Sequence, residues 1–259
     1  MPLSKNQKDI ISALLERKIE EKLKRYARES RSMPFLARLI QDSEKVASYS
    51  FIHSLATTLG MSIYEDVSKI IAEETADECF TKYDIGGVLS REQKSVISDI
   101  IRKLRNKEKN VNHEEELKLV LKASAKNGTV QNEGRIADFY MLRDGQEHYF
   151  EIKTVKPNID VFTKSKSKIL EWVARRRKPI KYFLAFPYNP YHPKPYERFT
   201  EQGLLERGKE FLIGDEYWNF LGGENTFEEL LNLFDVVGKN YKEKIKEKIR
   251  QVAREKMQH

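Results

Sequence analysis

The chain has 259 residues, of which 39% are hydrophobic and 10% aromatic. That is enough apolar material to pack one large domain, or a core domain with a helical extension, and it excludes global disorder. Basic residues outnumber acidic ones, 47 to 40, and the formal net charge of +7 favours a polyanionic partner. The single cysteine, Cys79, excludes internal disulfides and thiolate zinc clusters.

Neither a membrane-spanning segment nor a secretory leader is indicated. The chain has no run of about 18 apolar residues, and its first residues, MPLSKNQKDI, lack the apolar stretch of a signal peptide. We therefore expect a soluble, cytoplasmic protein with no membrane partner.

The first half of the chain has the periodicity of amphipathic helices. Ser4 is placed to cap a first long helix. Breaks are expected at Pro34, at Gly60, at the glycine pair 86–87 and at the Asn-Gly pair 127–128. Between the breaks, the spacing of apolar residues predicts helices over about residues 44–60, 63–80, 90–106 and 112–125.

The pattern changes to β-branched and aromatic runs between about residues 135 and 187. It predicts strands for RIADFYML, EHYFEIKTV and IKYFLAF, with a helix at about 163–178 between the second and the third. A short strand, KEFLIG, and two closing helices at about 226–237 and 239–257 follow. We expect an α/β fold in which residues 1–125 form a helical part and residues 126–259 form the core with C-terminal helices, together one compact unit.

A hairpin brings three polar residues together. The Asp-Gly pair 144–145 lies between two strand-like runs, which is a strong signal for a tight antiparallel turn. A two-residue or symmetric four-residue loop places Asp138 opposite Glu151, whereas a three-residue loop with a bulge would shift the pairing by one. Because side chains alternate along a strand, Glu151, Lys153 and Asp138 then share one face. The other face carries residues that we expect in the core: Ala137, Phe139, Met141, Phe150 and Ile152.

The three polar residues suit metal-assisted hydrolysis of phosphodiesters. Two carboxylates as close as Asp138 and Glu151 repel each other, and Mg²⁺ resolves this because it prefers one or two carboxylates with water and phosphate oxygens. Lys153 could hold or polarise a water beside a phosphate. The alternative is an ion pair between Asp138 and Lys153 on a solvated face, with Glu151 as a bystander.

At these residues the chain resembles the PD-(D/E)XK nucleases, with Ala137 where many members have proline. Asp138 is followed, about a dozen residues later, by Glu151-Ile152-Lys153. The longer strings GRIADFY, YFEIKTVKPNIDVFTKSKSKILEWVARR and GDEYWNFLGG resemble the TdeIII family of type II restriction endonucleases, from about residue 60 to 237.

The resemblance implies a restriction endonuclease-like mixed-sheet core with a helical N-terminal part. It also implies a homodimer that needs Mg²⁺ and cuts both strands of double-stranded DNA at a short palindromic site, with a GGNCC-type target. Asp138 and Glu151 would ligate the metal, the carbonyl of Ile152 would complete its site, and Lys153 would orient or activate the attacking water. The N-terminal helical part would help the chain to dimerise.

Many members of the superfamily add a third acid from an upstream helix, and Glu74 is the candidate here. In the predicted helix 63–80 it falls within the apolar stripe that contains Val67 and Ile70, and an acid on a buried face needs a partner such as a metal. The alternative is a frayed helix end at which Glu74 is solvated.

Basic residues cluster after the second strand of the hairpin. In the helix at about 163–178, apolar side chains point one way, and we expect the basic ones to project from the other side, where they can bind phosphates beside the cut. The alternative is an ordinary solvated basic face. The predicted DNA contacts are Lys156, Asn158, Lys164, Lys168 and Arg175.

These observations predict an Mg²⁺-dependent type II restriction endonuclease. No glycine-rich stretch matches a phosphate-binding loop, so we expect no nucleotide cofactor. Two alternatives stay open: a structure-specific or repair endonuclease on the same core, and a DNA-binding protein without catalysis, in which the acids form only ion pairs.

Overall fold

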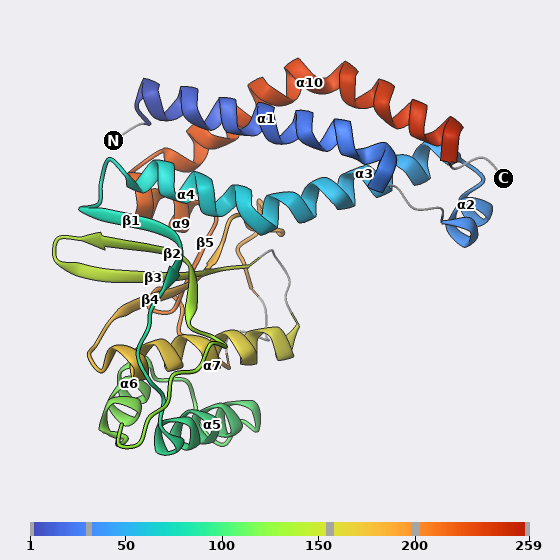
Figure 1. The fold of residues 1–259 in the computed structure, drawn as a ribbon. Coiled ribbons are helices and arrows are strands. Elements are labelled where there is room, and N and C mark those ends of the chain that lie inside the picture. Colours follow the sequence, from blue (N-terminus) through green and yellow to red (C-terminus); the bar gives the residue numbers. More distant parts are fainter. Residues whose placement is uncertain (1–2, 30–32, 154–157, 198–202, 257–259) are drawn as a thin grey trace. The chain divides into compact units, whose positions relative to one another are not determined.

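A computed structural model describes residues 3–29, 33–153, 158–197 and 203–256. The chain divides into two compact units, one of residues 1–70 with 225–259 and one of residues 71–224 (Figure 1). The first unit is helical, and the second contains the sheet. The proposed role of residues 1–125 as a packing and dimerising part stays a prediction.

The helical unit is formed by segments from both ends of the chain. It contains α1 (Lys5–Glu29), α2 (Pro34–Ile40), α3 (Ser43–Thr58), a short π-helix η1 (Leu59–Ile63), most of α4 (Tyr64–Ala72), and α10 (Thr226–Lys256). Helix α10 packs against both α1 and α3. Their shared core contains Tyr26, Val46, Ala47, Phe51, Val252 and Ala253.

The start of α1 is as predicted. The Ser4 hydroxyl accepts a hydrogen bond from the Gln7 main-chain N–H at 3.2 Å, and the Gln7 side chain accepts one from the Ser4 N–H at 2.9 Å. This reciprocal pair satisfies two N–H groups that have no partner within the helix.

The predicted break near Gly238 is wrong, because α10 is one helix of 31 residues. Val237 and Tyr241, on either side of the glycine, are 2% and 7% exposed, so both are anchored in the helical unit. Glycine inside a helix costs only about 1 kcal/mol relative to alanine, which this burial readily offsets.

The sheet unit contains five strands in the order β1-β2-β3-β4-β5. Strands β1 (Glu78–Asp84), β2 (Ile136–Arg143) and β3 (Gln146–Ile152) are antiparallel, whereas β4 (Lys181–Phe186) and β5 (Phe211–Ile213) continue the sheet in parallel with β3. The predicted mixed α/β fold is therefore confirmed, and it is consistent with a restriction endonuclease-like core.

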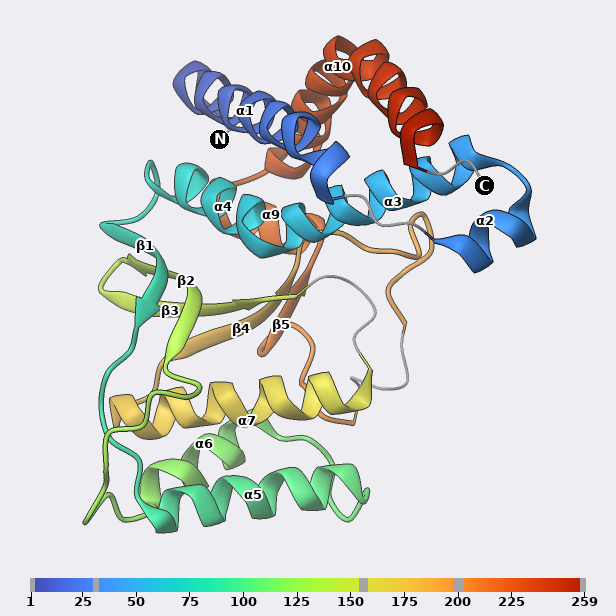
Figure 2. The ribbon, with the colours of Figure 1, turned by 45° about the vertical axis from the view of Figure 1, so that its right-hand side comes forward.

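Helices cover both faces of this sheet. Helix α7 (Ile159–Arg176) lies on the face that carries Tyr149, with α5 (Arg91–Arg105) and α6 (His113–Lys122) packed against α7 (Figure 2). Helix α9 (Asp215–Gly222) lies on the opposite face, where Tyr217 contacts Phe150.

The hairpin has the predicted register. Tyr140 pairs with Tyr149 and Arg143 with Gln146. Asp144 and Gly145 have φ of 51° and 71°, which fits a two-residue type I′ turn. The five apolar residues predicted to face the core are all buried, between 0% and 5% exposed: Ala137, Phe139, Met141, Phe150 and Ile152.

The predicted helix 63–80 is wrong at its C-terminal end. Helix α4 ends at Ala72, and Glu78 begins strand β1. The segment after Ala72 forms a strand because it pairs along β2, from Glu78 opposite Leu142 to Asp84 opposite Ile136. No helix within the described ranges is both long and apolar enough to cross a membrane.

Candidate active site

The hairpin brings Asp138, Glu151 and Lys153 together on one side of the sheet. The Ile152 main-chain N–H donates to Asp138 Oδ2 at 2.7 Å, which fixes this carboxylate beside β3. Lys153 Nζ lies 2.5 Å from Glu151 Oε1 and 4.0 Å from Asp138 Oδ2. Two acids and one ammonium group therefore meet where the hairpin strands end.

Helix α7 adds a second ammonium group. Lys168 Nζ forms an ion pair with Glu151 Oε2, so the carboxylate of Glu151 lies between two lysines. The Glu151 side chain is 5% exposed, whereas those of Asp138 and Lys153 are 24% and 30% exposed. Glu151 is thus the buried centre of the cluster, and this geometry does not fit the alternative in which it is a bystander.

The charges around Asp138 are not fully balanced. Burial and the neighbouring Glu151 carboxylate raise the pKa of Asp138, although Lys153, Lys168 and the Ile152 N–H act in the opposite direction. A pKa raised in this way shows that the ionised carboxylate lacks compensation. A cation bound at this position would supply it.

The donor set fits Mg²⁺. Two carboxylates and the adjacent main chain of Ile152 are hard oxygen ligands, and Mg²⁺ commonly takes one or two carboxylates and keeps several waters. In the parts of the chain that the structure describes, no group of three or more His, Cys, Asp or Glu side chains could hold a metal ion. A metal at the hairpin would thus have two side-chain ligands, Asp138 and Glu151.

Helix α7 is held over this site by a repeated pairing with β3. Glu147 pairs with Arg176, Tyr149 contacts the Trp172 ring at 6.2 Å between centroids, and Glu151 pairs with Lys168. Each step is two residues along the strand and four along the helix. The two spacings match because two strand residues span about 6.7 Å and four helical residues about 6 Å.

The same spacing, continued by two residues beyond Glu151 and four residues before Lys168, leads to the pocket beside the site. It places Lys164 level with Lys153, and both line a pocket of about 540 Å³ that also contains Glu151 and Lys168. The pocket carries four lysines, the fourth being Lys94, and three acids including Glu151. The side chain of Lys164 is exposed, so its charge is accessible from solvent.

The prediction for Glu74 is wrong. This residue lies in the turn after α4 and is exposed, as the alternative of a frayed helix end anticipated. Next to it, the Thr75 hydroxyl accepts a hydrogen bond from Arg143, at the turn end of the hairpin. Arg143 is five residues from Asp138 along β2, or about 17 Å at strand spacing. Glu74 is therefore not brought to the carboxylate pair.

The expectation that Arg175 projects from the outer side of α7 is also wrong. Its side chain is buried, and the guanidinium donates to the carbonyl oxygens of Gln131 and Glu133, both at 3.1 Å, and contacts those of Gly86 and Gly87. Arg175 ties two loops to the helix, so its charge does not face solvent.

Asn158 has a structural role that the sequence analysis missed. Its side chain is the N-cap of α7 and accepts the Val161 N–H at 2.9 Å. The helix consequently begins at Ile159 rather than at about residue 163. Lys156, another predicted DNA contact, lies outside the described residues.

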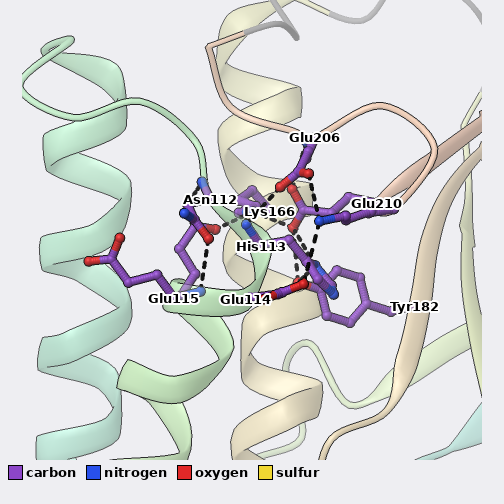
Figure 3. A network of polar contacts seen from close by, with 10 residues as sticks. Asn112, His113, Glu114, Glu115, Lys166, Tyr182, Glu206 and Glu210 are labelled. Carbon is purple, nitrogen blue, oxygen red and sulfur yellow. Dashed lines mark hydrogen bonds and ion pairs between the residues drawn. The ribbon is translucent and has the colours of Figure 1, made fainter.

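A buried charge network fixes the other side of α7 (Figure 3). Lys166 is fully buried and forms ion pairs with Glu210 and, at 2.5 Å, with Glu116. Tyr182 donates to Glu210 at 2.9 Å and lies 3.1 Å from His113 Nδ1. The signal for this network is in the sequence, because Lys166 falls on the same helical face as the buried Phe162 and Ile169.

The fold and the site together define a class, and comparison with known proteins supports it. The family described as "Type II restriction endonuclease, HinfI" matches residues 3–238. The type II restriction enzyme MjaII of Methanocaldococcus jannaschii is 32% identical, over 94% of this chain and 74% of that enzyme. HgiEI of Herpetosiphon aurantiacus, also a type II restriction enzyme, is 26% identical over 92% and 94% of the two chains. No solved structure gives a significant match.

The protein is a type II restriction endonuclease, an enzyme that acts on double-stranded DNA. Within that class the chain belongs to the HinfI family. The resemblance to the TdeIII family is not confirmed, whereas the wider class that it implied is.

Proposed function

We propose that the enzyme hydrolyses phosphodiesters in both strands of a short palindromic DNA site, in an Mg²⁺-dependent reaction at the hairpin cluster. The observation that carries this proposal is the position of Glu151, which is buried beside Asp138 and held between two lysines. A purely structural ion pair would need only one of these lysines.

Each residue of the hairpin cluster would have a distinct role in the reaction. Asp138, Glu151 and the carbonyl of Ile152 would hold the metal, which when bound stabilises the charge that grows on the phosphate and on the leaving 3′ oxygen. Lys153 would orient the attacking water and favour its deprotonation. The hydrogen bond from the Ile152 N–H keeps the Asp138 carboxylate in place while this happens.

The pocket beside Glu151 offers a place for the DNA backbone. Lys164 and Lys168 line it one helical turn apart, and ammonium groups at this spacing can contact neighbouring phosphate oxygens. Pairing of Lys168 with Glu151 in the absence of DNA keeps the lysine at the site. We propose that the metal replaces Lys168 beside Glu151 and that Lys168 then contacts the scissile phosphate. Lys164 would contact an adjacent phosphate.

Cleavage of both strands of a palindrome suggests a homodimer, since two-fold symmetry of the DNA matches two-fold symmetry of the protein. The GGNCC-type target implied by the TdeIII resemblance stays a prediction, as does the cytoplasmic location.

A plasmid of known sequence tests the proposal. With Mg²⁺ the protein should give discrete fragments whose mapped ends share one short sequence, and chelation of the metal should stop cleavage. Preference for flaps or junctions, with no shared sequence at the ends, would instead support the repair endonuclease.

The matched variants are Asp138→Ala at the site and Asp99→Ala on α5. Asp99 is an exposed acid that pairs with Arg102 and Lys103 of its own helix. We expect D138A to abolish cutting while DNA binding in Ca²⁺ persists, and D99A to cut normally. Normal cleavage by D138A would place the active site elsewhere.

A further inference from the structure

The helical unit carries a basic surface of its own. A hollow of about 820 Å³ lies between α1 and the C-terminal half of α10. We call it the α1–α10 groove. Five of its lining side chains are basic and two are acidic, namely Lys24, Lys244, Lys248, Arg250 and Arg254 against Glu247 and Glu255.

The cations of this groove lack acidic partners among the described residues, whereas two other lysines of α10 have them. Outside the groove, Lys239 pairs with Asp235 at 2.6 Å and Lys246 with Glu243 at 3.0 Å. In the groove, none of the five basic side chains forms an ion pair with a described residue. Lys248 donates to the Gln251 side chain at 3.0 Å, Lys244 lies 5.0 Å from the centroid of the Tyr241 ring, and Arg250 interacts electrostatically with Glu243. Positive charge left uncompensated in a concave surface attracts a polyanion.

The dimensions of the groove fit a DNA strand. Lys244 and Arg254 are ten residues apart on one helix, which corresponds to about 15 Å. One strand of B-DNA advances 3.4 Å per base pair, so this row of cations spans about four phosphates.

The side chains of the groove favour contact with phosphates over the reading of bases. The amide group of Gln251, which could hydrogen-bond a base edge, already donates to Glu255 at 2.8 Å and accepts from Lys248 at 3.0 Å. The remaining cations provide charge without a fixed pattern of donors and acceptors.

We infer that the α1–α10 groove binds the phosphate backbone of double-stranded DNA, as a sequence-independent contact separate from the cleavage site. The inference rests on the proposed function only in taking duplex DNA as the partner. It gives the helical unit a part in DNA binding, whereas the contacts predicted from the sequence all lie between residues 156 and 175.

Two triple variants of the full-length protein test it. K244Q/R250Q/R254Q removes three charges from the groove, and K239Q/K242Q/K246Q removes three from lysines of the same helix that line a different hollow. Glutamine has nearly the helix propensity of lysine and arginine, so both variants should keep α10, which circular dichroism and thermal melting would check.

The readout is the salt dependence of binding to a duplex in Ca²⁺, which prevents cleavage. Each phosphate contact contributes about 0.9 to the slope of log K against log salt. The groove variant should have a slope shallower by about 2 to 3, so that between about 50 and 200 mM salt its affinity falls by a factor about 16- to 64-fold smaller than that of the wild type. The control variant should keep the wild-type slope.

Three results would overturn the inference: an unchanged slope in the groove variant, an equal loss of slope in the control, or a groove variant whose sedimentation shows a changed oligomeric state. The last would make the groove a contact between subunits. Single-turnover cleavage at saturating DNA and low salt tests the proposed function separately from the groove inference. Under these conditions the wild type, the groove variant and the control variant should cut at the same rate. A wild type that binds DNA without cutting would refute the cleavage proposal while leaving the salt comparison valid.

Discussion

Glu151 illustrates how one residue can be both buried and charged. Its two oxygens contact Lys153 and Lys168, so the negative charge is compensated from the sheet and from the helix above it. The same two contacts limit access to the carboxylate. A metal that binds here must replace at least one of them.

This competition predicts that Lys168→Met will bind Mg²⁺ more tightly. Removing a partly buried ammonium group that pairs with a ligand should strengthen metal binding a few-fold, since such pairs contribute up to about 1 kcal/mol. Calorimetric titration of Mg²⁺ without DNA measures this. Lys164→Met is the control, because Lys164 is one turn away on the same helix, and it should leave metal binding unchanged. A weaker Mg²⁺ affinity in K168M would show that Lys168 does not compete for Glu151.

The buried network around Lys166 predicts unequal roles for its two acids. Burial alone would raise the pKa of Glu210, but Lys166 and hydrogen bonds from His113, Lys166 and the Glu206 main chain lower it to about 2. Burial raises the pKa of Glu116, and the charge of Lys166 only partly opposes this.

Glu210→Gln should therefore destabilise the protein far more than Glu116→Gln at pH 7. An acid whose pKa is lowered by folding stabilises the native state above its unfolded pKa of about 4.3, and this contribution disappears as the pH falls towards 2. Breaking such a buried pair costs about 3 to 5 kcal/mol. Denaturant unfolding across this pH range measures the difference. It should be largest at pH 7 and vanish near pH 2, and an equal cost for both variants would contradict the assignment.

At the scale of single residues, the sequence predicted which polar side chains of the hairpin meet, but not which basic residues of α7 are buried. Asp138, Glu151 and Lys153 were placed together because a two-residue turn and strand alternation determine which side chains share a face. Lys166 and Arg175 were treated as members of a basic cluster, although both are buried. Charge alone does not distinguish a solvated lysine from one whose acidic partner is distant in sequence, such as Glu210.

At the scale of elements, Arg175 connects α7 to two loops through hydrogen bonds from its guanidinium. Its guanidinium satisfies main-chain carbonyls of residues 131 and 133 and contacts those of residues 86 and 87. Arg175→Met keeps much of the side-chain volume but removes the charged donor that these carbonyls share. We expect a loss of about 2 to 4 kcal/mol of unfolding free energy, measured by urea denaturation. The neighbouring Arg177, which is exposed at the end of α7, provides the control.

Because α10 continues through Gly238 without a break, we predict a substitution there that raises the stability of the protein. A Cβ added at Gly238 would meet no atom within 4 Å, and the position lies inside a helix. Gly238→Ala should therefore stabilise the protein by about 0.5 to 1 kcal/mol, visible as a higher melting temperature. A lower melting temperature would indicate that the helix needs the glycine at this point.

Among the elements, local patterns predicted most helices and strands, although α2 and α9 carried no prediction. Two predictions failed for reasons that are not local. The sequence after Ala72 forms β1 only because β2 lies beside it, and this pairing joins residues about sixty positions apart. The continuity of α10 likewise depends on the burial of Val237 and Tyr241 against other segments of the helical unit. In both cases a tertiary contact outweighed the local preference.

At the scale of the whole molecule, the division into two units was not visible in the sequence. The helical unit combines the first 70 residues with the last 35, and apolar periodicity within one segment does not reveal which distant segment completes its core. The class of enzyme was easier to predict, because the nuclease motif is confined to a single hairpin.

The proposed homodimer is tested by sedimentation velocity of the protein without DNA. We expect a species of twice the 30.5 kDa chain mass at micromolar concentration, because recognition of a palindrome pairs two identical subunits. A monomer that cuts one strand per binding event, with nicked circles accumulating before linear plasmid, would contradict this.

Strand β1 forms one edge of the sheet, and its character restricts how two molecules can meet. Six of its seven residues are at least partly exposed, several of them are charged, and Lys82 has a φ of 52°, which breaks the regular extended backbone. Edges of this kind resist addition of a further strand. Newly made chains should thus be protected from sticking together through β1 while they fold, and any stable pairing of subunits must use another surface.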